Sequence, residues 1–231
     1  MLEGFLWKQD IDLALAQEVT TPLLSAIRRY TAHMHVGTDM RGTAILLKDG
    51  TPITDIKRIP SGRGMATILN GTWIVNIYAP SGAEKKNERE TFYNTDLTYI
   101  LPTAQADMIL AGDFNCTLSK RDSTGTNNYR RALANIVNGF DLIDAWNKST
   151  SRRMYTHYTA TGASRIDRIY ATSNIMSKKL GVETVAAAIT DHHAVILHIA
   201  ISAPLTLRGR GYWRMNIAIM SDKNFQTIIQ K

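Results

Sequence analysis

The sequence contains a single cysteine, Cys116, among its 231 residues. One thiol excludes an internal disulfide and fits a reducing compartment. Long apolar runs are also missing, since none approaches the roughly 18 residues of a membrane-spanning helix. Lys8, Asp10 and Asp12 interrupt the apolar pattern at the N-terminus, which excludes a secretory signal there. The sequence therefore predicts neither secretion nor a membrane partner.

Low-complexity segments and internal repeats are absent as well. With 44% hydrophobic and 20% charged residues, the chain has the material for one sizeable core. Positive charge is in excess, and the formal net charge of +7 indicates a polyanionic partner such as a nucleic acid. After Pro204 the pattern changes, because residues 207–214 combine glycines and arginines with aromatic residues. Such a segment is either a solvated linker or a surface on which bases can stack.

The most informative stretch is Asp113-Phe114-Asn115. The apolar run from 108 to 111 predicts a short buried strand, which ends at Gly112 and this acid and amide. Residues i and i+2 of an extended chain point to the same side, so the Asp113 carboxylate and the Asn115 amide would lie together. They could hold a water or a phosphate there, or they could cap the next turn.

Further polar groups lie at the ends of other expected strands. Asp167 lies in the alternating stretch 165–170, Asp191 and His192 precede the apolar run 194–199, and Glu18 closes the stretch 11–17. Carboxylates, an amide and an imidazole suit hydrolysis of a phosphodiester with a divalent metal. Oxygen ligands favour Mg²⁺ or Mn²⁺, and there are too few soft ligands for a structural zinc site. The remaining histidines are expected to be ordinary strand or loop residues: His33, His35, His157, His193 and His198.

Five short motifs follow one another along the chain. They are Gln17-Glu18, Asn76-Ile77-Tyr78-Ala79-Pro80, Gly112-Asp113-Phe114-Asn115, Ser164-Arg165-Ile166-Asp167 and Asp191-His192. In this order they resemble the exonuclease/endonuclease/phosphatase superfamily, and within it the apurinic-type endonuclease domain of non-LTR (LINE-type) retrotransposon proteins. The resemblance covers roughly residues 2–201.

The resemblance implies roles for individual residues at a metal and a water. Glu18 would be a metal ligand, and Asp191 would assist at the metal site. Asp113 would activate or orient the attacking water, while Asn115 positions it. The expected cofactor is Mg²⁺ or Mn²⁺, and the expected substrate is DNA.

The resemblance also implies contacts to the nucleic acid. Tyr78 would contact the scissile phosphate, although packing within its strand is the other interpretation. Asp167 would pair with His192, whose charged form can face the phosphate oxygens. The polar stretch 159–164 would reach into a DNA groove and help to choose the cleavage site. Its candidate DNA-binding residues are Thr159, Thr161 and Ser164, together with Arg165, which directly follows the stretch.

The expected elements alternate between strands and helices. Asn70-Gly71 predicts a hairpin between 65–69 and 72–78. Helices are expected over 23–30, 84–101 and 129–137, and a second hairpin is expected between 155–158 and 165–171. The predicted fold is α/β (α+β), a DNase I-like, four-layer sandwich of two mostly antiparallel β-sheets flanked by helices.

Residues 1–203 are expected to form the endonuclease/exonuclease/phosphatase domain, and residues 204–231 a basic linker toward an absent reverse transcriptase. Family members open with a strand that carries an Asn, which is not present before Leu2 to Lys8, so the first strand is expected to be missing. Three functions remain open: an endonuclease that nicks DNA to leave a 3′-hydroxyl primer, an abasic-site repair endonuclease or a phosphatase, and an inactive remnant that binds nucleic acid. The first would act in the nucleus, with element RNA as a further partner.

Overall fold

The computed structural model describes residues 2–20, 27–38, 40–48, 52–82, 84–125, 130–146, 154–187 and 190–200. All of them belong to one compact unit, Met1–Ala200. The linker expected over 204–231 lies outside the described residues. Within the described ranges, no helix is long and apolar enough to cross a membrane.

A six-stranded sheet forms the centre of the unit. Its strands, in spatial order, are β4 (Thr54–Arg58), β5 (Gly64–Leu69), β6 (Thr72–Tyr78), β7 (Met108–Asp113), β11 (Asp167–Ala171) and β8 (Ile143–Asp144). Only β6 and β7 pair in parallel, and the other neighbours are antiparallel. The predicted hairpin between β5 and β6 is confirmed, with Asn70 and Gly71 at φ 49° and 78°. Positive φ at both positions is what a two-residue hairpin turn requires.

A three-stranded sheet packs against the central sheet. It consists of β1 (Leu13–Val19), β3 (Gly42–Lys48) and β2 (Tyr30–Val36), in the order β1-β3-β2. Asn76 of β6 joins the two sheets: its buried amide donates to the carbonyls of Ala16 and Ala44 at 2.9 and 2.8 Å and accepts from Gln17 at 2.6 Å. A buried amide left without these partners would be costly, so this network fixes how the sheets face each other.

Side chains of β3 alternate between two hydrophobic clusters, as the period of two in a strand requires. Ala44 and Leu46 pack with Leu6 of α1 (Leu2–Lys8), whereas Ile45 and Leu47 pack with Met65 of β5. The three-stranded sheet is therefore covered by α1 on one face and by the central sheet on the other.

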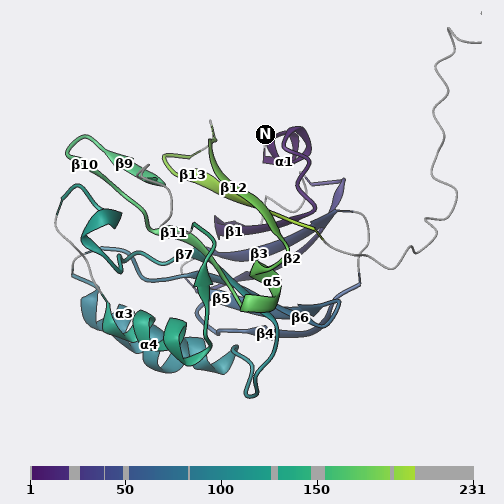
Figure 1. Cartoon of the computed structure of the whole chain (residues 1–231), viewed down its shortest axis with the longest axis horizontal. Helices are drawn as coiled ribbons and strands as arrows, with labels where there is room; N and C mark the ends of the chain where they lie inside the picture. Colours follow the sequence, from purple (N-terminus) through teal and green to yellow (C-terminus); the bar gives the residue numbers. More distant parts are fainter. Residues whose placement is uncertain are drawn as a thin grey trace, which may run out of the picture. The chain divides into compact units, whose positions relative to one another are not determined.

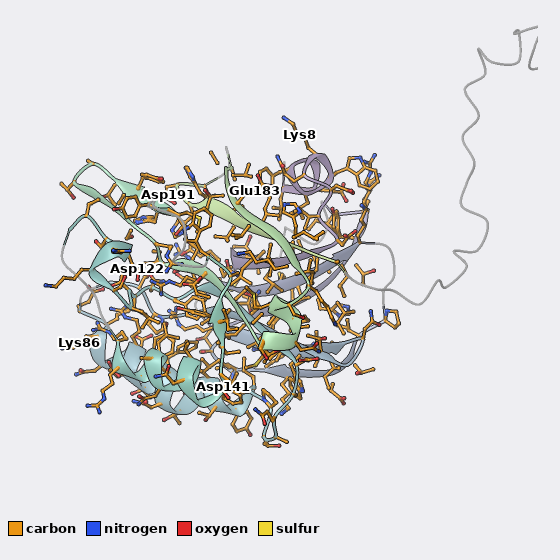
Figure 2. All side chains as sticks on the ribbon, viewed as in Figure 1. Lys8, Lys86, Asp122, Asp141, Glu183 and Asp191 are labelled. Carbon is orange, nitrogen blue, oxygen red and sulfur yellow. The ribbon has the colours of Figure 1, made fainter. Side chains whose placement is uncertain are left out.

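Helices cover the other face of the central sheet. They are α3 (Lys86–Thr91), a π-helical turn (Phe92–Asp96), a 3₁₀ turn (Leu97–Tyr99) and α4 (Arg131–Gly139). Phe92 and Leu133 from these helices share a buried cluster with Val75 and Leu110 of the sheet. The layers are thus helix, sheet, sheet and helix (Figure 1), with side chains filling the space between them (Figure 2). The predicted α/β fold and its four layers are confirmed.

Several further elements complete the described chain. They are the 3₁₀ turn Lys120–Asp122, the hairpin of β9 (His157–Thr159) and β10 (Gly162–Ser164), the short helix α5 (Ser173–Met176), and the ribbon of β12 (Lys179–Ala186) and β13 (His193–Ile199). Among the described strands, β1 pairs only with β3, and β13 only with β12. The expectation of a missing first strand stays a prediction.

Two predicted elements differ in the structure. Most of the helix expected over 23–30 falls outside the described residues, but 27–29 are not helical and Tyr30 begins β2. The second hairpin closes earlier than predicted, because β9 pairs with β10 and not with β11. β11 instead lies between β7 and β8, where Tyr170 is buried in the core. In both places burial in a sheet overrides the local pattern.

Candidate active site

Three neighbouring strands of the central sheet bring polar side chains together. Tyr78 is the last residue of β6, Asp113 is the last of β7 and Asp167 is the first of β11. The register pairs Tyr78 with Asp113 and Asp113 with Asp167. Directly paired residues point to the same face of a sheet, so these three side chains lie side by side at the ends of their strands. Tyr78, Asp113 and Asp167 are called the row below.

The turn after β7 orients the Asp113 carboxylate. Asn115 donates to both of its oxygens, from the backbone N–H at 2.9 Å and from Nδ2 at 2.8 Å, and the same amide reaches the Ala79 carbonyl at 2.9 Å. Gly112 has φ 138°, and a Cβ at this position would lie 2.0 Å from the Ile77 carbonyl oxygen. Only glycine fits there. The two side chains lie together, as the i, i+2 spacing predicts.

Asp167 pairs with His192, whose Nδ1 lies 2.9 Å from Asp167 Oδ2. The buried Thr156, which sequence reasoning missed, fixes both segments. Its hydroxyl accepts from the Asp167 backbone N–H at 3.1 Å, and its carbonyl accepts from the N–H of His193 at 2.6 Å. No local pattern marks Thr156, since its role depends on segments that are distant in sequence.

The charges of the row and of His192 suit a site that binds both a cation and an anion. Burial, together with the neighbouring Asp167 carboxylate, raises the pKa of Asp113 to about 8. Burial opposes the charged form of His192, but the hydrogen bond and charge of Asp167 outweigh it and raise the pKa of His192 to about 9. The imidazole is therefore protonated at neutral pH and can donate to a phosphate oxygen.

The donor set fits a hard divalent cation. Asp113, Asp167 and His192 have candidate ligand atoms within 4.8 Å of one another, and because His192 is protonated, the two carboxylates are the groups that would hold the cation. Two carboxylates at close range repel each other, and a cation between them would relieve this repulsion. One or two carboxylates plus water are what Mg²⁺ usually takes from a protein.

Glu18 approaches the row from the other sheet. It lies in a bulge of β1, where the register shifts between Gln17 and Val19, and has φ 55°. Its Oε1 accepts from the Tyr78 hydroxyl at 2.6 Å, and its Oε2 lies 3.6 Å from Arg41. Burial and the bond to Glu18 raise the pKa of Tyr78, so this phenol stays neutral and is a hydrogen-bond donor.

Asp191 lies in a different group from Asp113. It is 74% exposed, with its Oδ2 3.6 Å from Nε2 of His157. His157, expected to be an ordinary histidine, thus joins Asp191 and His192 in a second cluster whose ligand atoms lie within 4.8 Å of one another. The sequence carries no signal for this cluster, because it forms through a backbone bridge between His157 and His192.

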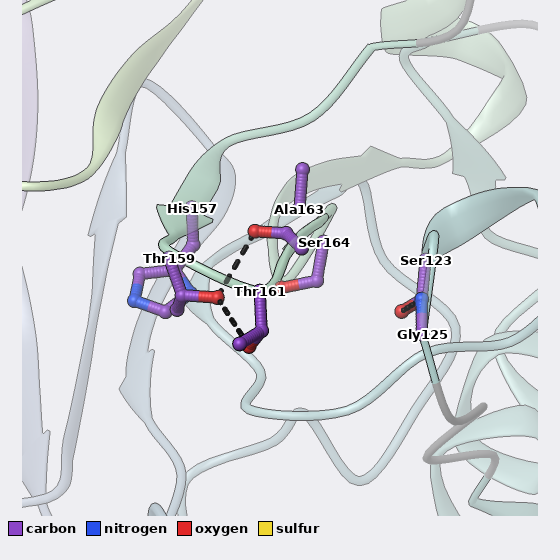
Figure 3. Close-up of a pocket in the computed structure, with 8 residues that line it drawn as sticks. Ser123, Gly125, His157, Thr159, Thr161, Ala163 and Ser164 are labelled. Atoms are coloured by element: carbon purple, nitrogen blue, oxygen red, sulfur yellow. Dashed lines mark hydrogen bonds between the residues drawn. The ribbon is translucent and has the colours of Figure 1, made fainter.

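The predicted DNA-binding residues separate into two groups. Thr159, Thr161 and Ser164 line an open pocket on the β9–β10 hairpin, where the Thr159 hydroxyl donates to the Gly162 carbonyl at 3.1 Å (Figure 3). Arg165 is only 13% exposed and forms ion pairs with Asp122 and Asp144 at 2.9 and 2.7 Å. This geometry favours a structural role for Arg165, in contrast to the DNA contact that the sequence predicts.

Comparison with known proteins finds a curated relative and solved structures with a similar fold. A curated relative from Xenopus laevis, the transposon TX1 uncharacterized 149 kDa protein, is 30% identical over 162 residues, which is 66% of this chain but only 12% of the relative. An AP endonuclease from Archaeoglobus fulgidus is 16% identical, with a TM-score of 0.72 over 87% of this chain and 93% of that one. The 3′ phosphatase NExo from Neisseria, bound to product DNA hairpin, has the same identity and coverage with a TM-score of 0.73. At this identity the two structures show the fold alone.

The family match covers more of the chain than the curated relative does. Residues 6–192 match the endonuclease/exonuclease/phosphatase family, and this range includes every residue of the row and of the second cluster. Such enzymes typically depend on a divalent metal, which agrees with the neighbouring carboxylates of Asp113 and Asp167. The DNase I-like fold expected from the motifs is confirmed by the two solved structures. The chain therefore belongs to the endonuclease/exonuclease/phosphatase family, whose members hydrolyse phosphate ester bonds.

Proposed function

We propose that this chain is a metal-dependent DNA endonuclease domain of a LINE-type retrotransposon, which nicks target DNA and leaves a 3′-hydroxyl primer for reverse transcription. The observation that carries the proposal is the row of Tyr78, Asp113 and Asp167, with His192 held protonated beside it. The transposon protein among the relatives supports the choice of element. Nuclear location and a contact with element RNA rest on the resemblance and stay predictions.

The side chains divide the reaction between them. Asp113, oriented by Asn115, accepts a proton from the water that attacks phosphorus. The bond from phosphorus to the 3′ oxygen breaks, and this leaving oxygen takes a proton from solvent to become the 3′-hydroxyl. His192 donates from its other ring nitrogen to a phosphate oxygen, and Asp167 keeps the imidazole oriented and charged. Tyr78 holds its hydroxyl at the same edge, next to Glu18. Mg²⁺ or Mn²⁺ would supply a further positive charge for the phosphate oxygens.

The β9–β10 hairpin is the proposed DNA-reading element. The hairpin also contributes Tyr158 to a second pocket, whose lining includes Tyr155 and His193. The Tyr158 ring is about half exposed and lies 4.8 Å from the ring of His193. Exposed aromatic rings offer stacking surfaces for bases, and the net charge of +7 favours a polyanion.

A comparison of substrates tests the proposal. The purified chain with Mg²⁺ would receive a supercoiled plasmid, a duplex with one abasic site and a duplex with a 3′-phosphate end. We expect plasmid nicks that a polymerase extends without further treatment, and no nicking when the metal is chelated. Faster cleavage at the abasic site than elsewhere would favour a repair endonuclease, and 3′-phosphate release alone would favour a phosphatase. DNA binding without hydrolysis of any substrate would favour an inactive remnant.

Exchange of the hairpin tip tests how the target is chosen. Replacing Thr159 to Ser164 by another six-residue turn sequence should move the cleavage positions on a fixed duplex more than it changes the total rate. The physical reason is that the tip lies on its own hairpin, whereas Asp167 belongs to the central sheet. Nick positions mapped at nucleotide resolution provide the measurement. An unchanged nick map would mean that the hairpin is only a connection.

A further inference from the structure

We propose that His157, Asp191 and His192 form a second metal site, which shares His192 with the active site and binds a transition-metal cation such as Zn²⁺, and that its occupation switches the nuclease off. The site is the second cluster described above, in which one ligand atom from each residue lies within 4.8 Å of the others. Two imidazoles and one carboxylate suit Zn²⁺ or Co²⁺, whereas Mg²⁺ prefers an all-oxygen shell. The binding part of this proposal stands alone, and the inhibition rests on the proposed nuclease function.

The backbone holds the two imidazoles side by side. His157 lies on β9, at the start of the hairpin (Figure 3), and forms a bridge to His192. A hydrogen bond of 2.6 Å from the His193 N–H to the Thr156 carbonyl holds the same two segments together. The two rings are 4.6 Å apart, so both can turn a nitrogen toward one point. Cross-strand neighbours of this kind need little ordering when a ligand arrives.

The existing distances are close to those of a bound site. A tetrahedral zinc with bonds of about 2.0–2.1 Å places its ligand atoms roughly 3.4 Å apart. His157 Nε2 and Asp191 Oδ2 are already 3.6 Å apart. The Asp191 side chain is 74% exposed, which leaves the site open to solvent (Figure 2). Three protein ligands with a fourth position for water would give a site that exchanges its metal.

Asp167 prepares His192 for this role. Its carboxylate takes the Nδ1 side of the ring at 2.9 Å, which leaves Nε2 as the nitrogen that can bind a metal. A carboxylate behind a histidine ligand raises the basicity of the ring and fixes its orientation. When Zn²⁺ binds Nε2, the proton on that nitrogen leaves to solvent. His192 then has no proton to donate to a phosphate oxygen, so hydrolysis stops.

Binding of Zn²⁺ to the full chain tests the site directly. The assay is competition with a chromogenic zinc chelator in millimolar Mg²⁺, together with the visible spectrum of bound Co²⁺. We expect one ion per chain, and at least tenfold weaker binding in His157→Gln. His198→Gln is the matched control, because His198 also has a carboxylate partner, Glu183 at 2.9 Å, but belongs to neither metal cluster. This control should bind Zn²⁺ as tightly as the unchanged chain, and equal melting temperatures would establish that both variants fold.

Plasmid nicking tests the consequence. Relative to its own rate in Mg²⁺ alone, His157→Gln should tolerate at least tenfold more Zn²⁺ than the unchanged chain before nicking is halved. Asp113→Asn serves to locate the ion, since it should keep its Zn²⁺ site. The proposal is overturned if Zn²⁺ binds equally well to His157→Gln, or if binding is lost in Asp113→Asn and kept in His157→Gln. A chain that binds Zn²⁺ as expected but nicks no DNA would refute the nuclease function and leave the metal site standing.

Discussion

Replacing Asp113 by Asn should lower plasmid nicking about 100-fold or more while the chain keeps its fold. The carboxylate is proposed to accept the proton of the attacking water, which an amide cannot do. The loss of stability should be modest, because burial and the Asp167 carboxylate disfavour the charged form of Asp113 and raise its pKa. An amide at this position still accepts one of the two hydrogen bonds that Asn115 donates. Supercoiled-plasmid nicking with Mg²⁺ measures the rate, and a thermal melt follows the fold.

The matched control is Asp12→Asn. This carboxylate is 86% exposed and lies 3.7 Å from Lys48, far from the strand ends that form the row. It should nick at the unchanged rate. Nearly unchanged nicking by Asp113→Asn would remove Asp113 from the catalytic group.

Asp167 and His192 should behave as one unit in the same assay. Either residue changed to Ala should also cost about 100-fold or more, because Asp167 acts through the imidazole that it orients. The double variant should lose no more than the worse single variant, since groups that act together are not additive. Losses that multiply in the double variant would show that the two residues act independently.

The parts of the site that the sequence predicts are those set by local chemistry. Asp113 and Asn115 lie together because two residues of extended chain separate them and a required glycine precedes them. The hairpin at Asn70-Gly71 follows from the positive φ of its two turn residues. Such features depend on a few neighbouring residues, so a single sequence contains enough information to find them.

The parts that the sequence does not predict depend on distant contacts. Arg165 looks like an exposed DNA contact, yet it is enclosed by Asp122 and Asp144. His157 looks like one strand histidine among several, and only its backbone bridge brings it to His192. Tyr30 is expected to end a helix over 23–30, but it begins β2 instead, because it pairs with Lys48 at the end of β3. Tertiary pairing decides each of these cases, and no local pattern reports it.

Loss of the Asp122 carboxylate should destabilise the fold strongly. Its buried carboxylate lies 2.9 Å from Arg165 and 3.0 Å from Arg168, and it also accepts from the backbone N–H groups of Leu118 and Ser119. The Arg168 side chain has no exposed surface. Asp122→Ala therefore leaves buried positive charge without its partner, and the free energy of unfolding should fall by about 3–5 kcal/mol. Urea unfolding measures this loss, and Asp12→Ala, which breaks an exposed pair, should cost less than about 1 kcal/mol.

The pH dependence of the unfolding free energy lost in Asp122→Ala shows whether the charge of Asp122 is responsible for that loss. Burial works against the charged form of Asp122, but the two arginines outweigh it and hold the pKa of this carboxyl below its usual 3.8. A group with a lowered pKa contributes stability above its unfolded pKa and loses that contribution as pH falls through its folded pKa. The unchanged chain should therefore lose stability below about pH 4 more steeply than Asp122→Ala, so that the gap between them narrows in acid. If the difference in stability between the two chains stays constant down to pH 3, Asp122 acts through packing and its backbone hydrogen bonds. Its charge would then contribute little to holding Arg165 and Arg168, which lie on either side of Asp167 in the sequence.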